Sequence, residues 1–178
     1  MQEIIVDEGK IKCLITGKMR KETPEEYVRQ EYCRILLDVY KYPKSYIDVE
    51  YPIKVGSTDK RCDIVVFNDN EKSQDNIYWI VETKKKDEKE GREQLWSYMS
   101  ATTANFGTWT NGDGILFYYK DTSRSNRYIE LPDIPKYKES IDSIGKYNKS
   151  DLVKCTDLKG VFNRCNNYFF SNQGLTQD

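Results

Sequence analysis

The feature that most constrains this chain is a short apolar run at residues 77–84, which ends in the charged residues Glu82 and Lys84. A run of this length, rich in Ile, Val, Tyr and Trp, predicts a buried β-strand. Such a strand normally excludes charge, because an unpaired ion away from water is costly. Residues two apart on a strand face the same side. We therefore expect Glu82 and Lys84 to point together into a polar site at the strand's end.

A second strand, predicted over residues 61–67, is separated from the first by a polar loop at residues 68–76. If the two strands form an antiparallel hairpin about the middle of that loop, opposed residues share a face of the sheet. Three opposed pairs are then predicted: Asp63 with Glu82, Val65 with Ile80, and Phe67 with Tyr78. Both faces are largely apolar, which is typical of central strands covered on both sides.

A helix is predicted from Pro24 to about Tyr40. Thr23 is a capping residue, Pro24 suits the first helical position, and Glu26 completes a capping box. Its buried stripe is predicted from apolar residues at helical spacing: Val28, Tyr32, Ile35, Leu36 and Val39. Glu31 falls on or beside this stripe. Its carboxylate is therefore either an ordinary solvated helix residue or a group aimed into a polar site.

A second helix is predicted over roughly residues 90–104, where Gln94 and Tyr98 lie four apart and share a face. Alternating apolar residues predict further strands at residues 47–55, 106–110, 115–119 and 127–131. Helices that alternate with strands in this order predict an α/β fold with a central mixed β-sheet flanked by helices.

The composition excludes several kinds of site. The chain has no histidine, which rules out His-based catalysis and His metal ligands within it, so any bound metal is expected to be a hard, oxygen-preferring ion. Five widely spaced cysteines without a CxxC motif indicate reduced thiols in the cytosol. No signal peptide and no apolar run of membrane-spanning length is visible, so a cytoplasmic protein without a membrane partner is expected.

Two opposed carboxylates without histidine suit Mg²⁺, which takes one or two carboxylates plus waters. A lysine two residues further along adds a charge that can orient water or stabilise a phosphorane-like transition state. Asp63, Glu82 and Lys84 together describe phosphodiester hydrolysis. The competing interpretation is a salt bridge at a strand end, followed by a solvated run of lysines.

The order of these elements resembles the PD-(D/E)xK nuclease superfamily. Five short matches make the resemblance closer, at residues 24–29, 61–66, 81–84, 94–98 and 110–112. Together they are similar to the N-terminal nuclease domain of type I restriction enzyme R proteins, over roughly residues 20–131. The resemblance implies a restriction-endonuclease-like core and a DNA endonuclease of a restriction–modification system.

The resemblance also implies roles for individual residues. Asp63 and Glu82 would hold Mg²⁺, for which Mn²⁺ is a substitute, with the carbonyl of Thr83 as a third ligand and Lys84 as the catalytic lysine. Further roles would fall to Gln94 and Tyr98, which support the site or contact DNA, and to Glu31, which matches a helix carboxylate near the metal in some members. Cys62 replaces the proline that the family has before the aspartate.

The expected partner is double-stranded DNA. Net charge is −1, so the basic surface must be local, and Lys60, Arg61, Lys85 and Lys86 cluster in sequence around the site. No element suits base readout, so sequence specificity is expected from other restriction–modification subunits or downstream domains. Two other functions stay open: a catalytically silent nuclease-fold module for DNA binding or subunit assembly, and an enzyme acting on branched DNA or RNA.

The predicted domain organisation is a nuclease-like domain at residues 1–131, a linker at 132–151 with little periodicity, and an amphipathic helix within 152–178. The last segment is similar to the junction that precedes an adenine-specific DNA methyltransferase in restriction–modification polypeptides. The R proteins themselves continue into a helicase motor. Neither a P-loop nor a methyltransferase motif is present here, so a downstream domain is expected beyond residue 178.

Overall fold

The computed structural model describes residues 4–123 and 127–145 of the chain. Within these ranges, six strands form one sheet in the order β4-β5-β6-β7-β8-β9. Neighbouring strands are antiparallel except β6 and β7, which run parallel and are connected through α2. The strand bounds are Ile47–Val55 (β4), Thr58–Phe67 (β5), Ile77–Thr83 (β6), Phe106–Thr110 (β7), Ile115–Asp121 (β8) and Arg127–Leu131 (β9).

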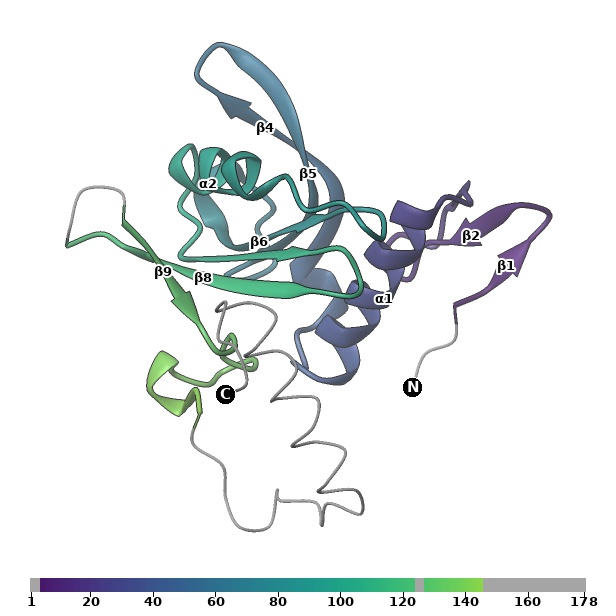
Figure 1. Cartoon of the computed structure of the whole chain (residues 1–178). Helices are drawn as coiled ribbons and strands as arrows, with labels where there is room; N and C mark the ends of the chain where they lie inside the picture. The colour runs from purple at the N-terminus through teal and green to yellow at the C-terminus, as the bar shows by residue number, and fades with distance from the viewer. Residues whose placement is uncertain (1–3, 124–126, 146–178) are drawn as a thin grey trace, which may run out of the picture. The chain divides into compact units, whose positions relative to one another are not determined.

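Two helices cover the two faces of this sheet (Figure 1). Helix α1 (Pro24–Asp38) packs in one core cluster with Ile64 and Trp79, and α2 (Arg92–Ser100) packs in another with Val65 and Ile80. The predicted α/β fold, a mixed sheet flanked by helices, is confirmed. The smaller elements are the antiparallel strands Val6–Asp7 (β1), Lys10–Lys12 (β2) and Met19–Lys21 (β3), and the 3₁₀ turns Lys44–Tyr46, Gln74–Asn76 and Ile141–Ser143.

Helix α1 begins as predicted and buries most of the predicted stripe: Tyr32 and Leu36 are buried, and Ile35 packs against the same core cluster. The side chain of Thr23 accepts a hydrogen bond from the backbone N–H of Glu26 at 3.1 Å, and Pro24 is the first helical residue. The predicted stripe ended in Val39, which is 52% exposed and follows the last helical residue. The prediction missed that three polar residues of the first two turns are buried as well: Glu26, Arg29 and Gln30.

The predicted register of β5 and β6 is confirmed at Val65, which pairs with Ile80, and is wrong at Phe67, which pairs with Ile77. The register shifts there because Tyr78 is an extra residue on β6, as in a β-bulge. Tyr78 consequently packs on the α1 side of the sheet, the same side as its neighbour Trp79.

The two strands of the β4–β5 hairpin bend half-way along their length, so that side chains change from one face of the sheet to the other. Ile47 and Val49 pack in the α1 cluster, whereas Ile53, on the same strand and also odd-numbered, packs in the α2 cluster. The bend occurs at Glu50, whose φ of 55° is a left-handed conformation that is strained for a residue with a side chain. Glu50 and Asp63 are the two residues skipped in the β4–β5 pairing.

The residues after β9 pack against the core rather than leaving it. Ile134 is buried in the α1 cluster, Tyr42 Oη donates to the carbonyl of Pro135 at 3.1 Å, and Tyr137 N donates to the carbonyl of Tyr40 at 2.8 Å. The segment predicted as a linker thus begins with residues that belong to the folded unit. The rest of that segment from residue 146, and the predicted C-terminal helix, lie outside the described residues.

Three of the five cysteines lie in the described part of the chain, and Cys13, Cys33 and Cys62 are all free and buried there. This agrees with the expectation of reduced thiols for those three residues. No helix among the described residues is long and apolar enough to cross a membrane.

Candidate active site

Glu82 and Lys84 form a buried ion pair at the end of β6. The side chain of Glu82 is only 1% exposed, and Lys84 Nζ donates to Glu82 Oε1 at 2.7 Å. The other carboxylate oxygen, Oε2, is buried and has no hydrogen-bond partner among the described residues. A buried carboxylate oxygen without a partner is costly, so this atom marks a position suited to a cation or a hydrogen-bond donor.

Burial and neighbouring charges shift the pKa values of both members of this pair. Burial, and secondly the charge of Asp63, raises the pKa of Glu82 to about 8, although the hydrogen bond from Lys84 opposes both. For Lys84, burial favours a lower pKa, but the hydrogen bond and charge of Glu82 outweigh burial and raise it. Lys84 is therefore a cation at neutral pH, and it does not by itself balance the neighbouring carboxylates.

Asp63 is held by β6 and by α1. Its Oδ2 accepts hydrogen bonds from the backbone N–H of Thr83 at 2.7 Å and from the Thr83 hydroxyl at 2.9 Å. Its Oδ1 accepts from Arg29 Nη2 at 2.8 Å. The prediction placed Asp63 directly opposite Glu82, but the regular β5–β6 pairing ends at Ile64 with Val81. Because the strands bend here, the carboxylate of Asp63 instead points to Thr83, which is the residue after Glu82.

Arg29 is the buried cation that joins three elements, with its side chain only 8% exposed. It contacts Glu26 Oε2 at 2.6 Å, Glu50 Oε1 at 2.8 Å and Asp63 Oδ1 at 2.8 Å. The bond to Glu50 also holds the residue with the strained backbone. Arg29 therefore stabilises both the bend of the β4–β5 strands at Glu50 and the orientation of Asp63.

Helix α2 supports Lys84 from the other face of the sheet. Lys84 Nζ lies 3.5 Å from Gln94 Oε1, and Gln94 Nε2 donates to Tyr98 Oη at 2.9 Å. The segment that enters α2 also lies close: a Cβ on Gly91, whose φ is 112°, would be 2.6 Å from Lys84 Cε. The structure thus brings Asp63, Glu82, Lys84, Gln94 and Tyr98 into one connected cluster.

Glu31 does not join this cluster. It pairs with Arg34 on the same helix, is 46% exposed, and lines a separate cavity of about 500 Å³ with Ile115. The α1 carboxylate near the site is Glu25, whose pKa is raised by burial and then by the charge of Asp63. Six residues of α-helix turn the side chain by roughly 120° from the starting direction, which is why Glu31 faces elsewhere.

The cluster has features suited to a divalent cation, although no group of three or more His, Cys, Asp or Glu residues gathers as metal ligands among the described residues. Mg²⁺ takes one or two carboxylates and completes its shell with water, so it does not require such a group. The unpartnered Oε2 of Glu82 and the carboxylate of Asp63 are ligands of that type. The donor set fits Mg²⁺.

Residues 24–135 match the sequence family of the type I restriction enzyme R protein N terminus. The chain belongs to this family. The predicted resemblance is thereby confirmed, and the matched residues form a restriction-endonuclease-like domain.

Two other comparisons add little to the assignment. A comparison with curated proteins finds no match. Among solved structures, this R-protein N-terminal domain is similar to a crystal structure described as a candidate nuclease of DUF820 from Anabaena variabilis ATCC 29413. The identity is 14%, the TM-score is 0.42, and the match covers 66% of this chain and 74% of that one. A likeness at this level carries no argument.

The basic residues predicted to contact DNA are exposed on the R-protein domain. Lys60 and Arg61 lie on the outer half of β5, which Figure 1 shows projecting from the sheet with β4, and Lys85 follows β6. Lys86 is exposed too, but its Nζ lies 3.3 Å from Asp113 Oδ1. Three of the four cations are thus on the surface without a described ion pair.

Sequence reasoning missed Arg29, Glu25 and Glu50 in this R-protein domain. A signal for Arg29 was present, because Glu26 and Arg29 lie three apart near a helix start, a spacing that favours an ion pair. Glu50 carried no signal, because a glutamate at an alternating position of a strand looks like an ordinary exposed residue.

Proposed function

We propose that this domain is a Mg²⁺-dependent DNA endonuclease of a restriction–modification system, which hydrolyses phosphodiester bonds. The observation that carries the proposal is the buried, unpartnered Oε2 of Glu82, on a carboxylate whose other oxygen accepts from Lys84 and whose pKa is raised by burial and then by the charge of Asp63. The family match supports it, because the family consists of N-terminal segments of restriction enzyme R proteins.

In this proposal, Asp63, Glu82 and the Thr83 carbonyl hold the metal ion. Bound Mg²⁺ would polarise a phosphoryl oxygen and lower the pKa of a bound water. Lys84 supplies a fixed positive charge to the phosphate, where charge develops in the transition state. Arg29 orients Asp63 through Oδ1, and the Gln94–Tyr98 hydrogen bond keeps the acceptor of Gln94 directed at Lys84.

Double-stranded DNA is the proposed substrate, with Lys60, Arg61, Lys85 and Lys86 contacting its phosphates. Such contacts position DNA but do not read its sequence. Specificity is therefore assigned to other restriction–modification subunits or downstream domains, and the proposed location is the cytoplasm, where the DNA lies.

The test is nicking of supercoiled plasmid in Mg²⁺ by the 178-residue chain, alone and together with the other restriction–modification subunits. Lys84→Ala is expected to lower the rate by about 10²–10³-fold, the size of effect seen when one electrostatic contact to a transition state is lost. Lys12→Ala, on the exposed strand β2, is the matched control and should keep full activity. Equal rates for wild type and Lys84→Ala under both conditions would remove the proposal.

A second candidate function is a nuclease-fold module without turnover, for DNA binding or subunit assembly. It is favoured by the engagement of Asp63 within the protein, since both of its oxygens already accept hydrogen bonds, Oδ1 from Arg29 and Oδ2 from Thr83. Metal affinity discriminates between the two. A domain that binds neither Mg²⁺ nor Mn²⁺ supports the silent module, whereas binding that depends on Glu82 supports the endonuclease.

A further inference from the structure

A cavity at the other end of β5 and β6 is lined by tyrosines and lysines that the proposed reaction does not use. Its volume is about 310 Å³, near the small end of the range for ligand pockets and suited to one base-sized group. Tyr78 and Glu82 are four residues apart on β6, which separates the cavity from the candidate active site by roughly 13 Å along the strand.

Two chain segments with alternating lysine and tyrosine meet at this cavity. The first, residues 41–46, carries Tyr42 and Tyr46, and the second, residues 136–138, carries Tyr137 between two lysines. The segments are joined by the hydrogen bond from Tyr42 Oη to Pro135, 93 residues further along the chain. Lysines interleaved with aromatic rings are the combination that single-stranded nucleic acid binding uses.

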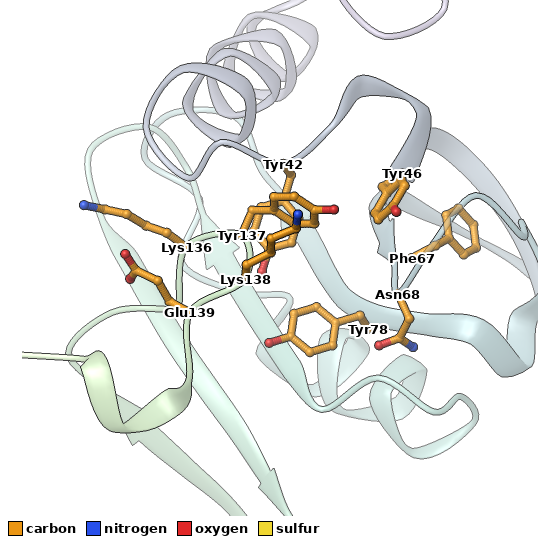
Figure 2. Close-up of a pocket in the computed structure, with 9 residues that line it drawn as sticks. All are labelled: Tyr42, Tyr46, Phe67, Asn68, Tyr78, Lys136, Tyr137, Lys138 and Glu139. Carbon is orange, nitrogen blue, oxygen red and sulfur yellow. The ribbon is translucent and has the colours of Figure 1, made fainter.

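The rings form a connected but open lining (Figure 2). The ring centroids of Tyr46 and Tyr137 are 5.7 Å apart at an interplanar angle of 88°, and those of Tyr42 and Tyr78 are 6.3 Å apart. Tyr46 and Tyr137 are only partly buried, so each presents ring surface to solvent. Exposed aromatic surface beside a cavity is a platform on which a planar group can stack.

The β-bulge on β6 supplies the floor of the cavity. In an uninterrupted strand Tyr78 would face the α2 side, but the extra residue turns it to the α1 side, where it lines the cavity. Bulges re-aim side chains and are enriched beside functional sites. Figure 2 shows Asn68 next to Tyr78; its amide nitrogen donates to Asn76 at 3.2 Å, and its carbonyl oxygen is a polar acceptor beside the rings.

The charge around the rings is suited to a phosphate. Lys138 Nζ lies 5.2 Å from the centroid of the Tyr137 ring, and Lys136 is exposed on the same segment. Glu139 lines the cavity with the opposite charge, and Figure 2 shows it on the side of Lys136, away from Tyr46. A base stacked on the rings would place its backbone near Lys138.

We propose that this cavity binds one unpaired base of a single-stranded nucleic acid, with Tyr46 and Tyr137 stacking on the base and Lys138 contacting the adjacent phosphate. The site is separate from the proposed metal site, and binding there requires no cleavage. The domain thereby gains a contact for the unpaired strand at a DNA end, gap or opened duplex, in addition to its duplex contacts.

The test uses the 178-residue chain and fluorescein-labelled dT₁₂, with the fully paired duplex as a second probe. Tyr46→Ala is expected to weaken dT₁₂ binding roughly 5- to 150-fold, the range measured for loss of one base–aromatic stack. Tyr46→Phe retains the stacking ring and should keep wild-type affinity. Tyr27→Ala, which removes a tyrosine 38% exposed on α1, is the matched control and should bind like wild type.

The lysines have an independent readout in salt. In Lys138→Gln, the slope of log affinity against log salt should fall by roughly 0.7, because each phosphate contact with a single strand contributes about that amount. Lys10→Gln/Lys12→Gln, on the exposed face of β2, should leave the slope unchanged.

Each of the following results would overturn the proposal. The wild-type chain does not bind dT₁₂. Wild type and Tyr46→Ala bind dT₁₂ with equal affinity. Tyr46→Ala loses as much affinity for the duplex as for dT₁₂. A tryptophan-containing peptide that binds wild type but not Tyr46→Ala, while dT₁₂ affinity is unchanged, would also overturn it in favour of a protein partner.

Discussion

Strands β5 and β6 carry a different polar site at each end. The ionic end, defined here as Glu25, Arg29, Glu50, Asp63, Glu82 and Lys84, is compact and mostly buried, and it holds its charges by ion pairs. The tyrosine end, defined as Tyr42, Tyr46, Tyr78 and Tyr137, surrounds an open cavity. One end is organised to hold charge away from water, and the other presents flat ring surface to it.

Both ends depend on a departure from regular strand pairing. At the ionic end, the β4–β5 strands bend at Glu50, and Asp63 points to Thr83. At the tyrosine end, a β-bulge places Tyr78 on the other face of the sheet. Such irregularities carry a cost in free energy and persist where the surroundings hold them. The regular middle of the two strands therefore supports two irregular ends, and each irregular end holds one of the polar sites.

The largest expected effect is a loss of stability when the cation of the ionic end, Arg29, is removed. Arg29→Met should lower the free energy of unfolding by about 3–5 kcal/mol, because it leaves buried carboxylates without their cation. Arg34→Met is a matched control on the same helix: its partner Glu31 is also three residues earlier, but the pair is exposed, so a loss of about 0–1 kcal/mol is expected. Urea unfolding measures both. Similar losses for the two variants would show that Arg29 does not organise this end.

The second effect is a dependence of stability on pH that arises at Glu82. Its pKa is raised on folding to about 8 from the ordinary value of 4.5, so the folded state binds the proton more tightly than the unfolded state. Stability from this group is therefore full below about pH 4.5 and is lost as the pH rises through 8. In EDTA, raising the pH from about 5 to 9 should cost wild type roughly 2–4 kcal/mol more than Glu82→Gln.

Urea unfolding at the two pH values checks this effect, and Mg²⁺ added at the higher pH should recover part of the loss. Parallel pH profiles for wild type and Glu82→Gln would contradict the account of the buried carboxylate. Binding of dT₁₂ at the tyrosine end should be the same in both proteins, since Glu82 does not line that cavity.

A smaller loss of stability is expected when a side chain is added at Gly91, which lies against Lys84 of the ionic end. Gly91→Ala introduces a Cβ 2.6 Å from Lys84 Cε and 3.1 Å from Trp109 Nε1. Gly9→Ala controls for backbone strain, because Gly9 also has a positive φ but nothing lies within 4 Å of its Cβ position. Thermal unfolding should show that Gly91→Ala costs about 1–2 kcal/mol more than Gly9→Ala. Equal losses would mean that Lys84 moves aside freely.

The middle of the fold was predictable from the sequence, and its irregular ends were less so. Alternation and pairing about the loop place Val65 opposite Ile80, because both strands are regular there. The same arithmetic fails at Phe67, since it assumes that no residue is inserted, and a bulge at Tyr78 carries no clear signal in its own residue type. Capping by Thr23 is local and is confirmed, whereas the carboxylate of Glu26, predicted to complete a capping box, accepts from Arg29 and Gln30.

The candidate site was predictable where its residues are neighbours on one element. Glu82 and Lys84 are two apart on a strand and Gln94 and Tyr98 four apart on a helix, so the period of each element brings them together. Arg29 is buried only because carboxylates from α1, β4 and β5 converge on it, which no single element reveals.

The most direct test of the central claim is calorimetric titration of Mg²⁺ and Mn²⁺ into the 178-residue chain and into Glu82→Gln, which keeps the size of the side chain and removes its charge. The account predicts one metal ion bound by wild type and at least about tenfold weaker binding by the variant, a difference of about 1.4 kcal/mol. Equal metal affinity in the two proteins would contradict it, because the unpartnered oxygen of Glu82 would then have no part in holding the ion.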